Sequence, residues 1–107
     1  MAASISNIIP ADGDNNVTIP KNDCSVTVTP QIHVTITSVC IQIDGGMLLP
    51  IYPSFAHPIW PASNSITFQL TQAQCPYRDT WYSLVVYAWD SAGDVSTGAS
   101  NFRRNSL

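Results

Sequence analysis

Hydrophobic and polar residues alternate with a period of two along most of the chain. This alternation is typical of β-strands that bury one face and leave the other toward solvent. The runs are short, and residues that favour turns separate them. The pattern predicts strands near residues 5–9, 24–29, 32–37, 39–43, 47–52, 66–71, 82–90 and 95–102.

Turn residues divide these runs in a way that favours antiparallel hairpins. Asp44-Gly45-Gly46 ends one run, and its glycines permit the positive φ of a tight turn. Ser91-Ala92-Gly93-Asp94 separates the last two runs. Seven or eight short strands with such turns predict an all-β antiparallel β-sandwich that occupies residues 1–107 as one domain.

Composition supports strands over helices. Of the 107 residues 45% are hydrophobic, and only 10% are charged, against about 25% in an average soluble protein. Glu is absent and Lys21 is the single lysine, so two favoured helix formers are almost missing. A surface this poor in charge tolerates packing against neighbouring molecules.

The strand predicted at residues 82–90 has an apolar residue at nearly every position. The alternate residues that are expected to point away from the core are Val85, Tyr87 and Trp89. Outward positions of a lone sandwich are usually polar, so this row predicts a surface that something covers. The proline-rich stretch at residues 50–61 supplies the cover in one interpretation and a contact surface for protein or sugar in the other. The candidate partner-binding residues are therefore Val85, Tyr87, Trp89, Trp60, Phe55 and Tyr52.

No arrangement of residues in the sequence predicts catalysis. His33 lies on the polar parity of a predicted strand and His57 follows in the proline-rich stretch, with no nucleophile motif near either. We therefore expect a non-enzyme without a cofactor.

Oxygen-bearing side chains at residues 12–16 raise the question of calcium, as do Asp90 and Asp94. Without the spacing of an EF-hand, turn-forming hydrogen bonds are the favoured interpretation and no metal is expected.

Three cysteines, Cys24, Cys40 and Cys75, leave at least one thiol unpaired within a monomer. Their spacing matches no zinc framework, so we expect buried or half-buried thiols, with one disulfide as the alternative.

Charge and hydropathy exclude several partners. The net charge is −3 and the only basic pair is Arg103-Arg104, so nucleic-acid binding is not expected. No apolar stretch approaches the ~20 residues of a membrane-spanning helix. Residues 1–4 lack the cationic start of a secretory signal peptide.

Three segments resemble bacterial and phage immunoglobulin-like domains, in the order in which those domains carry them. Ile9-Pro10-Ala11-Asp12-Gly13 resembles their opening turn, residues 41–45 their central strand and hairpin, and residues 82–96 their late strand and turn. Leu84 stands where antibody-type domains have a cysteine, which favours the bacterial, phage or fibronectin type III-like branch of immunoglobulin-like sandwiches. The resemblance implies that Tyr82 is a corner tyrosine whose hydroxyl bonds to the backbone upstream.

The resemblance and the charge-poor surface together suggest a structural role. We expect a virion accessory of a tailed phage, either a capsid decoration or a tail, neck or baseplate component, that binds other virion proteins or further copies of itself. The alternative is an extracellular or cell-surface adhesin or carbohydrate-binding module that stacks Trp60, Tyr87 or Trp89 on glycans.

Overall fold

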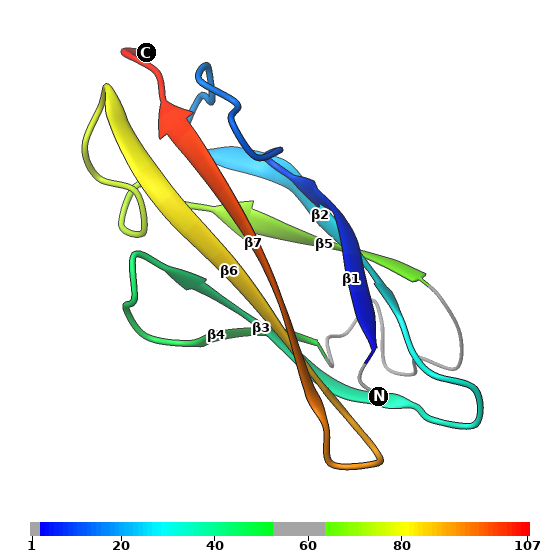
Figure 1. Cartoon of the computed structure of the whole chain (residues 1–107). Helices are drawn as coiled ribbons and strands as arrows, with labels where there is room; N and C mark the ends of the chain where they lie inside the picture. Colours follow the sequence, from blue (N-terminus) through cyan, green and yellow to red (C-terminus); the bar gives the residue numbers. More distant parts are fainter. Residues whose placement is uncertain (1–2, 53–63) are drawn as a thin grey trace.

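A computed structural model describes residues 3–52 and 64–107. It contains seven β-strands (Figure 1). Among the described residues, no helix has the length and hydropathy needed to cross a membrane. The strands are β1 (Ser4–Ile9), β2 (Lys21–Thr29), β3 (Ile36–Ile43), β4 (Leu49–Tyr52), β5 (Asn64–Leu70), β6 (Thr80–Asp90) and β7 (Val95–Arg104).

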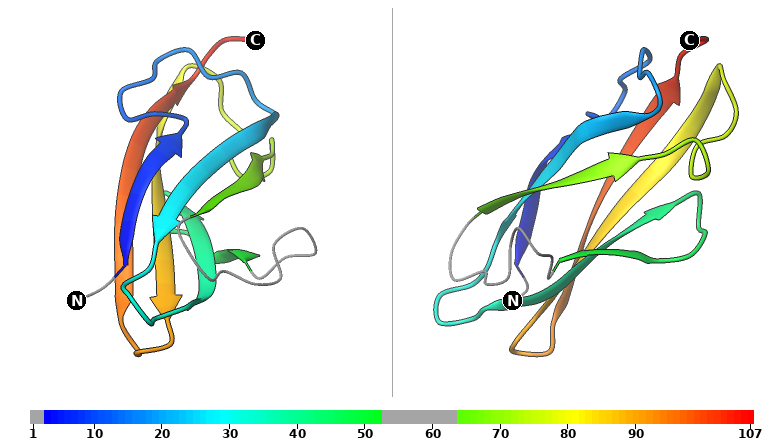
Figure 2. Two further views of the ribbon diagram at one scale, coloured as in Figure 1. Left: turned by 90° about the vertical axis from the view of Figure 1, so that its right-hand side faces the viewer. Right: turned by 180° about the vertical axis from the view of Figure 1, so that it is seen from behind.

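The strands form two antiparallel sheets that pack as a β-sandwich (Figure 2). One sheet has the order β1-β2-β5 and the other the order β4-β3-β6-β7. The β6–β7 ladder runs without interruption from the Thr80–Arg104 pair to the Trp89–Val95 pair. The prediction of an all-β antiparallel sandwich of seven to eight strands is confirmed, with seven strands in the described residues.

The core lies between the sheets, where the apolar faces of the two sheets pack against each other. In β2, Cys24 and Val26 are fully buried, while Ser25 and Thr27 on the other parity are half-buried. Removal of apolar surface from water at these positions is the main force that holds the sheets together. The strands of the second sheet contribute in the same way, through the buried Val39, Ile41, Tyr82, Leu84, Val86, Ala88 and Phe102.

One predicted strand is wrong. Residues 32–35 precede β3 and are not part of a strand, and Ile32 at their start is 85% exposed. The apolar positions change phase here, because Ile36 and Val39 are both buried although they lie an odd number of residues apart. A register shift between Ile36 and Ser38 accommodates that change.

On one side of the sandwich, β1 closes the gap between the sheets by packing against β7. The hydroxyls of Ser96 and Ser100 donate hydrogen bonds of 2.6 Å to the carbonyl oxygens of Ala3 and Pro10. Gly98 allows the close approach, because a Cβ atom built there would lie 2.7 Å from Cγ2 of Ile5. A larger residue at this position would push β1 away from β7.

The loop that joins β1 to β2 then covers the free edge of the last part of β7. Asp12 Oδ1 accepts a 2.8 Å hydrogen bond from the Asn101 N–H, and the Gly13 N–H donates to the Asn101 carbonyl at 2.7 Å. Farther along, Arg103 N–H donates to Asp14 O, and Val17 N–H donates to Arg103 O. Residues 12–17 thus satisfy backbone groups that an edge strand would otherwise expose.

Candidate interaction surface

The outward face of the four-stranded sheet carries the apolar row that the sequence predicted. Val85, Tyr87 and Trp89 of β6 are half-buried, and they alternate with fully buried residues of the same strand. Their cross-strand neighbours are uncharged residues of β3 and β7. We call the resulting surface the outer face, and it consists of Ser38, Cys40, Gln42, Val85, Tyr87, Trp89, Val95, Thr97 and Ala99.

Two aromatic side chains hold the centre of the outer face in a fixed arrangement. The rings of Tyr87 and Trp89 stack with centroids 5.9 Å apart and an interplanar angle of 22°. The Tyr87 hydroxyl donates a 2.9 Å hydrogen bond to Gln42 Oε1, and Gln42 Nε2 donates in turn to the Gly46 carbonyl at 2.8 Å. Since these rings are already ordered, a partner that contacts them loses little side-chain entropy on binding.

Cys40 places a thiol beside this stack. It pairs with Tyr87 across the β3–β6 ladder and is half-buried. Burial raises the pKa of the Cys40 thiol above its ordinary value, so at neutral pH the group is a protonated and weakly nucleophilic thiol. It contributes to the outer face as a small apolar side chain.

The remaining predicted contact residues do not join the outer face. The assignment of Tyr52 to a contact surface is corrected, because it is 3% exposed and pairs with Val39 of β3, whose side chain lies in the core. Phe55 and Trp60 lie outside the described residues, as do His57 and the part of the proline-rich stretch that follows Tyr52. The cover that this stretch was predicted to supply stays a prediction.

The structure adds a groove that the sequence did not indicate. It lies between the edge strands β4 and β5, on the side of the sandwich away from β1, and its volume is about 420 Å³. Ile41 and Phe68 from the core form part of its wall, together with Leu49 and Ile51 of β4. A smaller hollow of about 260 Å³ continues beside Met47, which is 81% exposed.

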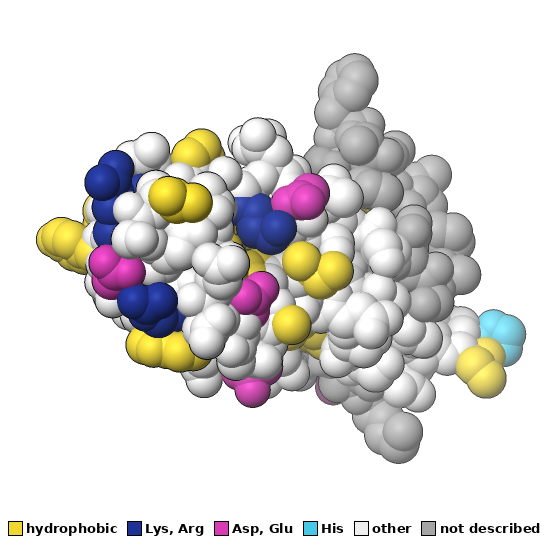
Figure 3. All heavy atoms as spheres, turned by 90° about the horizontal axis from the view of Figure 1, so that it is seen from above, with side chains coloured by type: hydrophobic (Ala, Val, Ile, Leu, Met, Phe, Trp, Pro, Cys, Tyr) yellow, Lys and Arg dark blue, Asp and Glu magenta, His cyan; other side chains and the backbone are white. Residues whose placement is uncertain are grey.

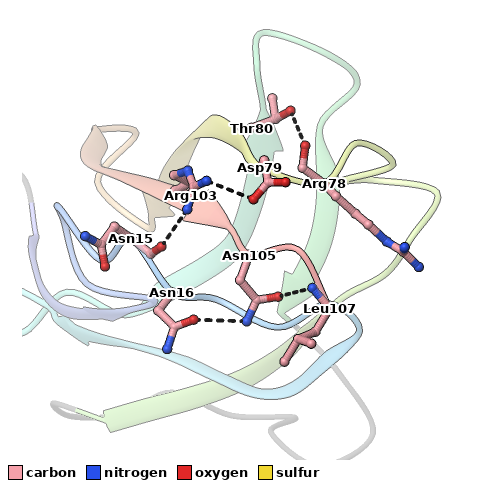
Figure 4. Close-up of polar contacts among 8 residues, drawn as sticks. All are labelled: Asn15, Asn16, Arg78, Asp79, Thr80, Arg103, Asn105 and Leu107. Carbon is pink, nitrogen blue, oxygen red and sulfur yellow. Dashed lines mark hydrogen bonds and ion pairs between the residues drawn. The ribbon is translucent and has the colours of Figure 1, made fainter.

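At the end of the sandwich where β7 finishes, polar side chains join separate segments of the chain. Basic and acidic groups alternate over this end (Figure 3). Arg103 donates to Asp79 Oδ1 at 2.8 Å and to the Asn15 carbonyl at 3.3 Å (Figure 4). Asn105 Nδ2 donates to Asn16 Oδ1 at 3.2 Å. These contacts tie the β1–β2 loop and the β5–β6 loop to the end of β7 and give the region a structural explanation.

The acidic residues considered for calcium form turn hydrogen bonds, as the favoured interpretation predicted. Asp14 Oδ1 accepts the Asn16 N–H at 3.1 Å, and Asp90 Oδ1 accepts the N–H groups of Ala92 and Asp94 at 3.0 Å. Such short side-chain bonds to following amides explain the enrichment of Asp in turns. In residues 3–52 and 64–107, no three His, Cys, Asp or Glu side chains gather in a way that could hold a metal ion.

Cys24 and Cys75 are fully buried free thiols. Burial raises the pKa of Cys24 to about 11 and that of Cys75 to about 12. Near Cys75 lies Arg104, only 2% exposed, whose Nη1 donates a 2.7 Å hydrogen bond to the Cys75 carbonyl. Since a thiol with so high a pKa is a poor nucleophile, neither cysteine has the environment of a catalytic residue.

Comparison with known proteins gives no relative from which a function could be carried over. No protein-family model matches the sequence, and a search of curated proteins finds no significant match.

Proposed function

We propose that this chain is a non-catalytic structural protein of the immunoglobulin-like class, on its fibronectin type III-like branch, that acts through protein–protein contacts. Seven antiparallel strands in sheets of three and four support that class. The resemblance of residues 9–13, 41–45 and 82–96 to bacterial and phage immunoglobulin-like domains supports a place in a virion. The corresponding role is a capsid decoration or a tail, neck or baseplate component.

The observation that carries the proposal is the chemistry of the outer face. Its nine residues include stacked Tyr87 and Trp89 and no charged side chain. Interface cores are enriched in Tyr and Trp and depleted in charge, whereas free surfaces keep Lys and Glu. The whole chain has one Lys and no Glu. A protein with such a surface is suited to a partner that covers it.

The test is incorporation into assembled particles, measured by mass spectrometry of purified virions. Trp89→Ser should abolish incorporation, because it removes half of the ring stack. Trp81→Ser is the matched control: Trp81 has the same outward parity on β6 but lies at the opposite end of the strand, 51% exposed. Absence of the wild-type chain from particles would refute the virion role, and equal incorporation of the Trp89 variant would refute the role of the outer face.

A second candidate function rests on the same aromatic pair. Parallel rings on an uncharged sheet face can support the apolar side of a sugar, which would make the chain an adhesin or carbohydrate-binding module at a cell surface. A glycan array with wild type and Trp89→Ala tests this function. Hits that disappear in the folded variant would support it, whereas a blank array for the wild type would exclude it for the glycans displayed.

A further inference from the structure

The backbone of β7 presents hydrogen-bonding groups to solvent along one part of its edge. In an antiparallel ladder, every second residue directs its N–H and C=O groups toward the neighbouring strand, and the residues between direct theirs away. The Asp90 N–H donates to the Asp94 carbonyl at 3.1 Å, which fixes the phase of this alternation. It follows that Ser96, Gly98 and Ser100 bond to β6. Val95, Thr97 and Ala99 therefore direct their backbone groups toward the edge.

The end of the same strand confirms the phase independently. Asn101 and Arg103 continue the series of Val95, Thr97 and Ala99, and their amide and carbonyl groups do point away from β6, because they bond to residues 12–17. That loop covers β7 from Asn101 onward. No strand pairs with β7 on this side in the described part of the chain, so residues 95–99 form an open edge.

β1 does not close this open edge. Ile5 and Ile8 approach the position that a Cβ atom of Gly98 would occupy, and this position lies on the inward side of β7. The three residues whose groups point outward along the edge are exposed, with Val95 at 49%. Figure 2 shows β1 beside β7 in the view from the edge, with β7 still visible along its length.

We propose that residues 95–99 pair antiparallel with the same residues of a second copy, about a two-fold axis at Thr97. In this register Thr97 faces Thr97 of the other copy and Val95 faces Ala99. Each of these three hydrogen-bonded pairs exchanges two N–H···O bonds. The proposal deepens the proposed assembly function, on which it rests, by naming another copy of this chain as one partner.

A second copy fits this edge better than a longer strand does. The open stretch is bounded by the turn after Asp90 at one end and by the capped Asn101 at the other. Around Thr97, the paired residues of each copy end at Val95 and Ala99, so the pairing stops before the capped Asn101 of the other copy. A longer partner strand would collide with residues 12–17. The stretch is Val-Ser-Thr-Gly-Ala, which contains none of the charges or prolines that normally prevent edge pairing.

Pairing in this way would join the two four-stranded sheets into one sheet across the axis. Val95, Thr97 and Ala99 belong to the outer face, so the outer faces of the two copies would become continuous. The dimer would then offer a larger uncharged surface to the rest of an assembly. Two copies related by a two-fold axis contact each other through identical patches. This two-fold arrangement is the commonest symmetry of protein oligomers.

The test uses the whole chain under reducing conditions, with sedimentation velocity over a range of concentrations and amide hydrogen exchange by NMR. We expect a concentration-dependent dimer. In that dimer the Thr97 and Ala99 amides become protected, whereas the Gly98 and Ser100 amides are protected at every concentration because they bond to β6. A chain that stays monomeric with fast exchange at Thr97 and Ala99 would overturn the proposal.

Two variants locate the contact. Thr97→Pro removes an edge amide without removing a bond to β6, and Thr97→Lys places like charges opposite each other; each should abolish the dimer. Ser6→Lys is the matched control, because Ser6 is exposed on the edge strand β1 of the other sheet, and it should dimerise like the wild type. Circular dichroism confirms that each variant is folded. A dimer that persists in both folded Thr97 variants would also overturn the proposal.

The two proposals fail in different ways. If the chain dimerises through Thr97 but is absent from particles, the dimer stands and the virion role falls. If the chain is monomeric in solution and also enters particles as a Thr97→Pro variant, which leaves the outer face uncharged, the assembly function stands and the pairing of copies falls.

Discussion

The hydroxyl of Tyr82 in β6 is bonded to the backbone of Tyr77, five residues upstream. It accepts the Tyr77 N–H at 2.7 Å and lies 3.3 Å from the Tyr77 carbonyl, to which it donates. The Tyr82 ring is buried and stacks on Phe102 of β7 with centroids 5.9 Å apart. The residue therefore anchors the loop between β5 and β6 to the core.

We expect Tyr82→Phe to destabilise the domain. The Tyr77 N–H would lose its partner while the ring stays packed, and loss of this partly buried hydrogen bond costs about 1 kcal/mol. Urea unfolding followed by tryptophan fluorescence measures the change. Tyr77→Phe is the control, because its side chain is 69% exposed and should change stability little. Equal stability of the Tyr82 variant and wild type would contradict the anchoring role.

The contact between Gly98 and Ile5 gives a second expectation. Gly98→Ala would place its methyl group 2.7 Å from Ile5 Cγ2, and such overpacking costs about 1–3 kcal/mol. The midpoint of thermal unfolding should fall. Ile5→Ala in the same chain should recover part of the loss, because it vacates the space. Independent, additive effects of the two substitutions would show that the clash does not occur.

The buried thiols make stability depend on alkaline pH. In the unfolded chain they lose their protons near their ordinary pKa of 9.0, whereas in the folded chain burial raises the pKa of Cys24 to about 11 and that of Cys75 to about 12. Above pH 9 the unfolded state therefore binds fewer protons, and the free energy of unfolding falls as pH rises. Each pKa unit of difference corresponds to about 1.4 kcal/mol.

Chemical unfolding between about pH 8 and about pH 11 measures this slope, because that range spans the ordinary thiol pKa of 9.0 and the raised pKa of Cys24 of about 11. A Cys24→Ala/Cys75→Ala variant should be less stable at pH 7, because it leaves small cavities, but should lose less stability on going to high pH. The same slope in variant and wild type would assign the pH dependence to other groups, such as the buried Tyr52, whose pKa burial also raises.

The three thiols should differ in accessibility. Cys40 is half-buried on the outer face, whereas Cys24 and Cys75 have no exposed surface. A maleimide should therefore label Cys40 alone in the folded chain, and slowly, because its pKa is raised. In an assembly that uses the outer face, Cys40 should be protected. Mass spectrometry of the labelled peptides reads both results, and fast labelling of Cys75 in the native state would contradict the buried core.

The strands that could be predicted are those in which apolar and polar residues alternate without interruption. In β2 the alternation of Val26, Thr27 and Val28 already separates the core face from the outward face, because successive side chains of a strand point to opposite sides. The anchoring role of Tyr82 was also predictable, from a resemblance rather than from periodicity. Tyr52 shows the limit of this reasoning, since an aromatic residue next to prolines can equally be core.

Other features of the structure depend on contacts between segments that are distant in the sequence, and the local pattern of apolar and polar residues does not predict such contacts. Ile32 lies in a run that alternates well, yet only the bulge before Ser38 decides which apolar residues enter the core. The groove beside Leu49 arises because β4 and β5 belong to different sheets. The cap on Asn101 joins residues separated by most of the chain.

The loop of residues 12–17 has a consequence for how this sequence can change. Because Asp12, Gly13 and Val17 each contact the backbone of β7, an insertion or deletion between them would uncover the end of that strand. The open edge of β7 would then extend from residues 95–99 to the whole strand, and the chain would aggregate instead of forming a dimer. Selection should therefore hold the length of this loop constant even where it tolerates other side chains.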